Sequence, residues 1–566
     1  MTPNRTGIPV EFDADVPTAP SSRDIPALAA LAADLSALDY TVDGVAQLLG
    51  VQAYDALGRG QLAPALLTSR SLLGSQSVPG RPALPGGHGG ADDDARAVPV
   101  LLWLLGESVD GSALAAALPG IGVAGLEQLG LIEPSDRTEA NDRSEAPDPM
   151  WRAAVELRPY SSDAGGDLWV ASDLGAEQRP GPLRHDHVLG IGGASMTLAQ
   201  AVMRLPVDRA LDLGTGCGIQ TFHLLQHARH VTATDLSERA LAFTRFNLLL
   251  NAAALELDPD TLEDRVSLRL GSMLEPVAGE QFDLVVTNPP FVITPRRSAD
   301  PVYTYRDGGR AGDAIVEDLI GELPGVLAPG GTAQLLGNWE ITEGTPWDRR
   351  VRGFVPAGVD AWVIQREQLT PVQYAETWLR DAAENRDREA HLRSFAAYLE
   401  DFGSRSVEGI GLGSVWLRRP RNPSDLVRVT LEEITHEIEQ PVGPHLAAAV
   451  ERGDWLAAHT EQASSGVGIA DEFLLVSDDV TEERHQRPGA EHPGVILLRQ
   501  GAGFRRTTLL TTELAGFVSA CDGDLTAGQI AGALAMLLER PDAAFTTELL
   551  LDVEHLVREG FLIPAV

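Results

Sequence analysis

The sequence predicts an α/β protein built on a doubly wound sheet, and three observations predict it. Short apolar runs alternate with helical patterns through the middle of the chain. One run leads into a glycine-rich turn at 211–218, L-D-L-G-T-G-C-G, and the next run ends in a carboxylate, Asp235. Ligands of such sheets bind beyond the carboxyl ends of the strands, where both features fall.

Seven apolar runs are expected to form the sheet, with helices between most of them. Together with the segment that precedes the first strand, they define a central domain at 180–422. The expected strands are 210–213, 231–235, 266–270, 284–287, 332–336, 361–365 and 414–417.

Two mainly helical domains are expected to flank the central one. Residues 1–25 are expected to be a disordered tail, followed by an N-terminal domain at 26–175 and, after the sheet, a C-terminal domain at 426–566. Each flank contains helix, turn, helix and an apolar exit, which suggests a winged-helix-like module. The helix expected at 122–129 carries no basic residue, which favours packing over nucleic-acid recognition.

The N-terminal domain reads in order as two helical stretches in 25–67, a flexible loop at 74–99, and a helix at 100–107. A hairpin formed by 155–159 and 167–172 ends it. The C-terminal domain shows three helical patterns and a closing strand, at 508–518, 526–538, 547–557 and 558–562.

Composition limits the chemistry. The 566 residues carry a formal charge of −37 and include no lysine, so a Walker lysine and a Schiff-base lysine are both excluded. An acidic surface opposes non-specific binding to nucleic acid, because that binding depends on neutralising phosphates. Solubility or the source organism's own bias explains the acidity equally well.

Cysteine and histidine content gives no metal site. The two cysteines, Cys217 and Cys521, are far apart, which fits a reducing compartment and excludes a disulfide framework. His185 and His187 have neither a cysteine nor an H-E-x-x-H motif nearby. No apolar run approaches the roughly 20 residues of a membrane span, and the N-terminus lacks a signal peptide's apolar core, so a cytoplasmic protein is expected.

The glycine turn predicts a nucleotide-type ligand. Glycines at alternate positions let the backbone approach a ligand, and the following helix start presents free N–H groups. Asp235 ends the next strand, where a carboxylate can hold two ribose hydroxyls. The third glycine of the dinucleotide fingerprint would fall at Ile219, which argues against a nicotinamide cofactor.

A second motif follows the expected strand at 284–287. It is Asn288-Pro289-Pro290-Phe291, and it comes after the glycine turn and Asp235 in that order. This combination resembles the class I S-adenosylmethionine-dependent methyltransferases, in particular the N-P-P-[FY] branch that methylates amide or exocyclic amino nitrogens. The resemblance covers about 180–420 and implies a Rossmann-like fold with S-adenosylmethionine as cofactor.

The resemblance also implies which residues form the site. Catalysis is expected from Asn288, Pro289 and Phe291. Cofactor contacts are expected from Asp212, Gly214, Thr215, Gly216, Gly218, Asp235, Leu236, Ser272, Met273 and Asn288. Ser272 stands where the family commonly has an aspartate that meets the adenine amino group. Substrate contacts are expected from Pro290, Tyr303, Tyr305 and Arg306. The glycine-rich segment 186–195 is expected to fold over the cofactor as a lid.

The motif also predicts how an amide nitrogen is activated. The Asn288 side-chain oxygen and the Pro289 carbonyl can accept the two N–H bonds of the acceptor, which aims its lone pair at the methyl carbon. Phe291 would stack on the planar group. No strong base is needed, because the nitrogen becomes acidic once it is alkylated.

The acceptor is less determined than the chemistry. The run V-I-T-P at 292–295 resembles release-factor glutamine methyltransferases, whereas Phe291 is more typical of the rRNA guanine branch. The acidic charge favours a glutamine in a protein. A nucleic-acid base, a small molecule, and a regulatory protein that binds the cofactor without turnover are the alternatives.

Overall fold

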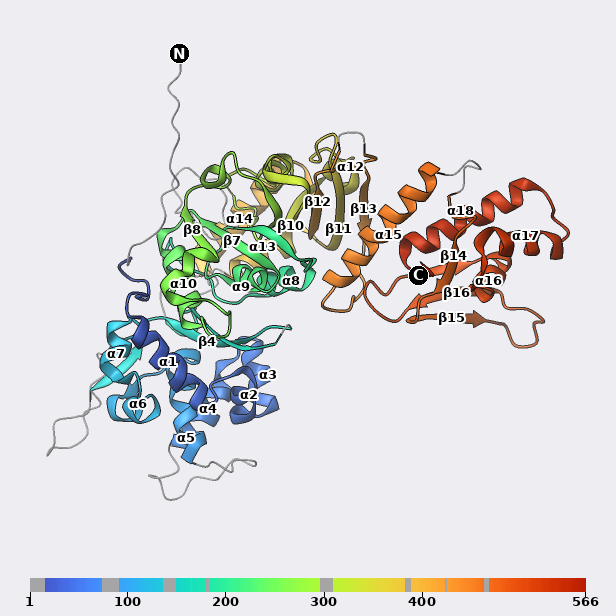
Figure 1. Ribbon diagram of the computed structural model, residues 1–566. Coiled ribbons are helices and arrows are strands. Elements are labelled where there is room, and N and C mark those ends of the chain that lie inside the picture. The colour runs from blue at the N-terminus through green and yellow to red at the C-terminus, as the bar shows by residue number, and fades with distance from the viewer. Residues whose placement is uncertain are drawn as a thin grey trace, which may run out of the picture. The chain divides into compact units, whose positions relative to one another are not determined.

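The computed structural model describes residues 16–73, 91–135, 149–163, 165–179, 183–295, 309–381, 388–422, 425–462 and 468–565 (Figure 1). It divides into two compact units. The first contains Met1–Ala199 and Pro206–Glu433, and the second contains Gln200–Leu205 and Ile434–Val566. The short segment 200–205 therefore belongs to the second unit although it precedes the first strand of the large sheet.

The first unit begins with a group of helices. Their starts are capped locally: the Asp24 carboxylate accepts from Ala27 N, and the Thr41 hydroxyl accepts from Gly44 N. The helices are α1 (Ile25–Ala37), α2 (Val42–Leu49), α3 (Val51–Gly58), α4 (Leu62–Leu73), α5 (Ala91–Pro99), α6 (Gly111–Ala117) and α7 (Gly122–Gln128). Strands β1 (Val109–Asp110), β2 (Ile132–Pro134) and β3 (Met150–Ala153) form a small antiparallel sheet.

Two expectations for this region are wrong in detail. Helix α5 begins at Ala91, inside the stretch expected to be a loop, and continues into a π-helical turn at Val100–Leu104, where a simple helix was expected. Residues 16–24, expected to belong to a disordered tail, make specific contacts, since Ser21 N donates to Leu129 O at 2.9 Å. No single helix among the described residues is long and apolar enough to cross a membrane. The bent pair α1 and α2 together has the length and apolar composition of a membrane span.

The expected hairpin is present as β4 (Glu156–Ser161) and β5 (Asp167–Ser172), paired antiparallel with Leu157 opposite Ala171. The other edge of β5 is bound by side chains of helix α10 (Glu238–Leu250) and its C-cap. Asn247 exchanges two hydrogen bonds with the backbone of Ala171, and Asn251 exchanges two with the backbone of Trp169. The asparagine pair thus has a structural role, because it fixes helix α10 to the edge of β5.

The large sheet has eight strands, not seven. Its order is β13 (Val429–Glu433), β11 (Asp360–Leu369), β12 (Val407–Arg418), β10 (Leu327–Thr342), β9 (Phe282–Thr287), β6 (Val207–Leu213), β7 (Ala228–Asp235) and β8 (Val266–Leu270). All seven expected strands lie within these elements. The eighth, β13, pairs parallel with β11 at the edge, and its V-T-L-E-E sequence lacks the apolar run that marks a central strand.

Helices cover both faces of this sheet, as the α/β prediction requires. Leu211 and Leu213 of β6 pack into a core with α11 (Ala314–Glu322). Asp212, between them, points to the other face and bonds Thr221 of α9 (Ile219–Leu225). The chain runs from β6 through β7 to β8 on one side and resumes at β9 on the other, so the crevice of the fold lies at the carboxyl ends of β6 and β9.

Three further helices support the far end of the sheet. Helix α12 (Trp347–Arg352) contributes Val351 to the same core as α11. Helices α13 (Pro371–Asp381) and α14 (Arg388–Ser404) pack together with β12 in a separate apolar cluster that includes Tyr374, Phe402 and Ile410. Helix α8 (Gly193–Ala201) precedes β6.

The second unit has its own core, which contains Phe517, Val553 and Phe561. Its helices are α15 (Gly443–Gln462), α16 (Thr512–Ser519), α17 (Ala527–Leu537) and α18 (Ala543–Glu559). One antiparallel sheet contains β14 (Phe473–Val476), β18 (Asp522–Thr526) and β19 (Leu562–Pro564); the other contains β15 (Val480–His485), β16 (Val495–Gln500) and β17 (Thr507–Leu510). The three expected helices are present, shifted by a few residues, while a winged-helix relationship for either flank stays a prediction.

Candidate functional site

The glycine turn leaves β6 in a conformation that only glycine adopts easily. Gly214, Gly216 and Gly218 all have positive φ, of 76°, 60° and 93°. Gly214 N and Thr215 N both donate to the Thr234 carbonyl of β7, each at 2.9 Å. A Cβ at Gly214 or Gly216 would meet no atom within 4 Å, so the turn borders open space that a ligand can fill.

Asp212 lies buried under this turn. Its Oδ2 accepts hydrogen bonds from the hydroxyls of Thr215 and Thr221, both at 2.7 Å. Its Oδ1 is buried with no hydrogen-bond partner in the described part of the chain. Burial raises the pKa of Asp212 to about 6, and the two threonine bonds offset part of that rise.

Asp235 connects the turn to helix α10. Its Oδ2 accepts from Gly216 N at 3.0 Å, and its Oδ1 accepts from Ser237 N at 2.9 Å. Burial raises the pKa of this carboxyl as well. Each oxygen keeps a lone pair for a further donor such as a ribose hydroxyl. The next residue, Leu236, is 62% exposed, which gives an apolar surface beside the carboxylate.

The residues after β8 lie next to Asp235. Gly271 N donates to the Asp235 carbonyl at 3.0 Å, and Glu275 N donates to the Ser272 carbonyl at 3.0 Å. Met273 has a positive φ of 49°, a conformation uncommon for a residue with a side chain. Ser272 and Met273 therefore occupy a tight turn at the same edge of the sheet as Asp235.

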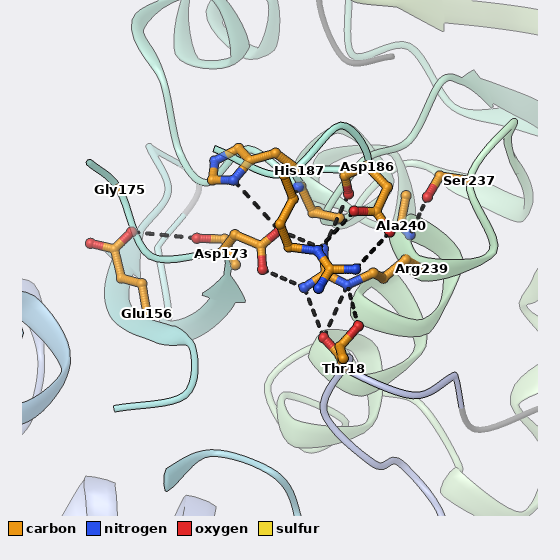
Figure 2. Close-up of polar contacts among 12 residues, drawn as sticks. Thr18, Glu156, Asp173, Gly175, Asp186, His187, Ser237, Arg239 and Ala240 are labelled. Atoms are coloured by element: carbon orange, nitrogen blue, oxygen red, sulfur yellow. Dashed lines mark hydrogen bonds and ion pairs between the residues drawn. The ribbon is translucent and has the colours of Figure 1, made fainter. Parts of the chain in front are cut away.

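Arg239, in the first turn of α10, binds three segments that precede the sheet, and Figure 2 shows them converging on its guanidinium. It forms a bidentate ion pair with Asp173 and donates to the carbonyls of Thr18 and Asp186. Val188 N also donates to Asp173, at 2.8 Å. Arg239 lies four residues after Asp235 in the chain. The start of the segment expected to form a lid is thus held by a residue close to Asp235 in the sequence. His187 Nδ1 lies 3.6 Å from Asp173 Oδ2.

Asn288 follows β9 directly, at the carboxyl end of the sheet. The preceding Thr287 hydroxyl donates to the Leu213 carbonyl at 2.7 Å, which ties this strand end to the glycine turn. The side-chain Oδ1 of Asn288 is buried, and no described residue donates a hydrogen bond to it. A buried acceptor without a donor costs on the order of 1–3 kcal/mol, so this oxygen is suited to receive a ligand N–H.

The two prolines shape the rest of the motif. Phe291 N donates to the Pro289 carbonyl at 2.7 Å, which closes a tight turn and uses one lone pair of that oxygen. The Phe291 ring meets Trp378 of α13 edge to face, with centroids 6.5 Å apart. The structure therefore brings together the residues expected from the glycine turn, Asp235 and the Asn-Pro-Pro-Phe motif. Tyr303, Tyr305 and Arg306 lie outside the described residues.

Sequence reasoning missed three polar residues at this edge: Arg239, Asn338 and Tyr374. Each acts through partners distant in the chain, such as Asp173 for Arg239 and Ile293 for Tyr374. The only signal in the sequence was the Tyr374 and Trp378 spacing of four, which places two aromatics on one helix face but is typical of core packing.

Comparison with known families gives two matches. The methyltransferase small domain matches residues 190–342, which hold the glycine turn, Asp235 and Asn288. A domain of unknown function, DUF7059, matches residues 37–143. Residues 190–342 thus match a methyltransferase domain, a class whose cofactor is S-adenosylmethionine.

Similar curated proteins include three methyltransferases. A ribosomal protein uL3 glutamine methyltransferase of Bradyrhizobium diazoefficiens is 30% identical over 160 residues, covering 27% of this chain and 46% of that protein. A release factor glutamine methyltransferase of Cereibacter sphaeroides is 35% identical over 170 residues, which cover 28% of this chain and 55% of that protein. A ribosomal RNA small subunit methyltransferase C of Alcanivorax borkumensis is 29% identical over 182 residues, which cover 32% of this chain and 48% of that protein. The chain spans about half the length of these relatives.

Proposed function

We propose that this chain, whose residues 190–342 match the methyltransferase small domain, transfers a methyl group to the side-chain nitrogen of a glutamine in a protein. Two of the three similar proteins described above methylate glutamine, in a ribosomal protein or a release factor. An acceptor of that kind belongs to the translation machinery, which would make the chain a cytoplasmic enzyme. The single observation that carries the proposal is the buried Oδ1 of Asn288 at the carboxyl end of β9, to which no described residue donates a hydrogen bond.

The cofactor's place follows from the glycine turn. The open space before Gly214 and Gly216 suits the methionine part of S-adenosylmethionine, and the spare lone pairs of Asp235 suit its ribose. Leu236 offers an exposed apolar surface to the adenine ring. The bound cofactor supplies an electrophilic methyl group on a sulfonium.

The chain's own residues hold and orient the acceptor. Asn288 Oδ1 accepts one N–H of the carboxamide, and the remaining lone pair of the Pro289 carbonyl accepts the other. With both bonds made, the nitrogen lone pair is directed out of the amide plane, toward the glycine turn. Phe291, fixed by Trp378, supports the flat face of the amide, and Pro290 offers no N–H that would compete for it. Orientation of this kind accounts for several kcal/mol of the barrier.

A second candidate is an exocyclic amine of an RNA base. Phe291 and the similarity to the ribosomal RNA small subunit methyltransferase C favour it. The same pair of acceptor oxygens would serve, because an exocyclic amine also carries two N–H bonds on a nitrogen with a delocalised lone pair.

The test is methyl transfer from labelled S-adenosylmethionine to purified release factor, ribosomal protein and rRNA. We expect label in a protein acceptor, at a glutamine identified by mass spectrometry. Asn288→Ala should lower kcat at least a hundredfold while the cofactor still binds, because it removes a bond that orients the acceptor. Asn422→Ala, a change in an exposed asparagine whose side chain bonds Asp425, serves as the matched control.

Three outcomes separate the candidates. Label in rRNA that depends on Asn288 would replace the glutamine by a base as the acceptor. Label in neither class, with tight cofactor binding, would exclude both and leave a small-molecule acceptor or a binding protein. Equal activity of the Asn288→Ala and Asn422→Ala variants would remove Asn288 from the mechanism.

A further inference from the structure

The hydroxyl of Tyr374, in helix α13, is bonded to the segment that follows the Asn-Pro-Pro-Phe motif. Ile293 N donates to it at 2.9 Å, and Asn338 Nδ2 of β10 donates to it at 2.6 Å. Tyr374 is fully buried, as are Ile293 and Asn338. One buried oxygen therefore joins a helix, a strand and the loop that carries Asn288.

The same face of α13 also holds the aromatic ring of the motif. Trp378 lies one helical turn after Tyr374, with ring centroids 5.9 Å apart, and its edge-to-face contact with Phe291 spans 6.5 Å. Helix α13 thus contacts the loop twice, at the ring of Phe291 and at the backbone of Ile293.

The loop depends on such outside contacts because it can make few of its own. Pro289 and Pro290 have no N–H to donate. The N–H of Phe291 is used inside the turn, on the Pro289 carbonyl. The N–H of Ile293 is then a backbone donor close after the motif that is fixed by another element, and its acceptor is the Tyr374 hydroxyl.

Asn338 lies beside this loop in the part of β10 that runs past its neighbour. Leu335 is the last β10 residue paired with β9, and it lies opposite Thr287. Asn338 comes three residues later in β10, beyond the end of β9, where the neighbouring chain is the loop that begins at Asn288. Its Oδ1 is buried without a partner among the described residues. If the Oδ1 and Nδ2 positions of this amide are exchanged, Oδ1 accepts the Tyr374 hydroxyl proton. The Nδ2 group then has no partner among the described residues.

Tyr374 is itself held firmly. It belongs to a buried cluster with Tyr398 and Phe402 of α14 and Ile410 of β12. The Phe402 ring meets it edge to face at 5.7 Å between centroids. A side chain packed on all sides in this way gives the loop a fixed point of attachment.

We propose that Tyr374, through Ile293 and Asn338, is a positioning residue that sets the orientation of the Asn288–Phe291 turn for methyl transfer. The expected loss of activity rests on the proposed function. The expected change in the loop rests on the hydrogen bonds alone. A small displacement of reacting groups lowers the rate strongly, so loss of the hydroxyl affects the transfer step rather than cofactor binding.

The test compares Tyr374→Phe with the wild type in the full-length protein. We expect kcat for methyl transfer to fall between about tenfold and about a hundredfold. KM for the acceptor and Kd for S-adenosylmethionine should change less than about twofold, since the residues that bind the cofactor are not touched. Tyr40→Phe is the matched control: it removes another buried hydroxyl, which donates to the Leu157 carbonyl at 2.8 Å in the N-terminal helical region.

A second measurement does not require activity. Hydrogen exchange at the Ile293 amide, followed by NMR or by mass spectrometry of short peptides, should be at least tenfold faster in Tyr374→Phe than in the wild type or Tyr40→Phe. Unchanged exchange would overturn the proposal. So would a kcat that falls no further than in Tyr40→Phe.

The two proposals fail in distinguishable ways. If the wild type methylates none of the acceptors, the proposed function fails, yet faster exchange at Ile293 would still support the positioning contact. If methylation occurs and depends on Asn288 but not on Tyr374, the function stands and the positioning role is excluded.

Discussion

At the scale of single residues, Asp212 has an unusual electrostatic position. Burial raises its pKa to about 6 from the ordinary 3.8. The folded chain therefore keeps this proton at pH values where the unfolded chain has released it. The contribution of Asp212 to folding is most favourable below about pH 4 and is lost as the pH rises through 6.

Asp212→Asn should remove this dependence. The amide oxygen can still accept from Thr215 and Thr221, but it never ionises. We expect the stability of the variant relative to the wild type to rise by up to about 3 kcal/mol between pH 4 and pH 7. Urea unfolding of both cofactor-free proteins across this range measures it. A relative stability that stays nearly constant between pH 4 and pH 7 would show that Asp212 is ionised in the folded protein throughout this range.

Single residues also show what the sequence could predict. The glycines and Asp235 were recognisable because their roles follow from the local backbone: positive φ at the turn and a carboxylate at a strand end. Tyr374 and Arg239 were not. Their partners lie 81 and 66 residues away, at Ile293 and Asp173, and only the fold brings them together.

At the scale of elements, the fit between α10 and the hairpin is made by hydrogen bonds. Asn247 donates to the carbonyls of Ala171 and Cys217, both at 2.9 Å, and accepts from Ala171 N at 2.8 Å. Because Cys217 belongs to the glycine turn, one side chain links the hairpin, the helix and the glycine turn.

Asn247→Leu should be strongly destabilising. It leaves three buried backbone groups without their bonds, and each costs on the order of 1–3 kcal/mol, so we expect a loss of about 3–9 kcal/mol. Asn247→Asp keeps the acceptor for Ala171 N but turns a carboxylate oxygen toward the buried carbonyls of Ala171 and Cys217, and should destabilise the fold at least as much. Urea midpoints of the three proteins measure the series. A leucine variant as stable as the wild type would mean that water or relaxation replaces these bonds.

The elements were predicted best where the sequence pattern is strong. The seven expected strands are apolar runs, six of them inside the sheet and one, β8, at its other edge, and each lies inside an observed strand. β13 was missed because an edge strand needs only one apolar face, and α5 was missed because its start, A-D-D-D, resembles a loop. The long part of β10 beyond Leu336 was missed because its Gly337 and Asn338 are poor strand formers.

At the scale of the whole molecule, charge distinguishes the two candidate acceptors. A chain with a net charge of −37 repels the phosphates of RNA. We expect no saturable binding of rRNA at protein concentrations up to about 10 µM in 50 mM salt, where basic proteins bind non-specifically. Filter binding measures it, with an Asn288→Ala variant as a control for site-specific contacts. Saturable binding that weakens steeply with salt would favour the nucleic-acid acceptor.

The small hairpin has a further consequence for how the chain behaves in crowded solution. A two-stranded sheet normally offers two open edges on which strands of other molecules can grow into aggregates. Here the outer edge of β5 is occupied by the two asparagine amides. On the outer edge of β4, Pro159 has no N–H to give, and the Leu157 carbonyl is taken by Tyr40. The edge of β5 is therefore covered by side chains, and the edge of β4 offers fewer backbone groups to an added strand, which should limit growth of strands from other molecules on the hairpin.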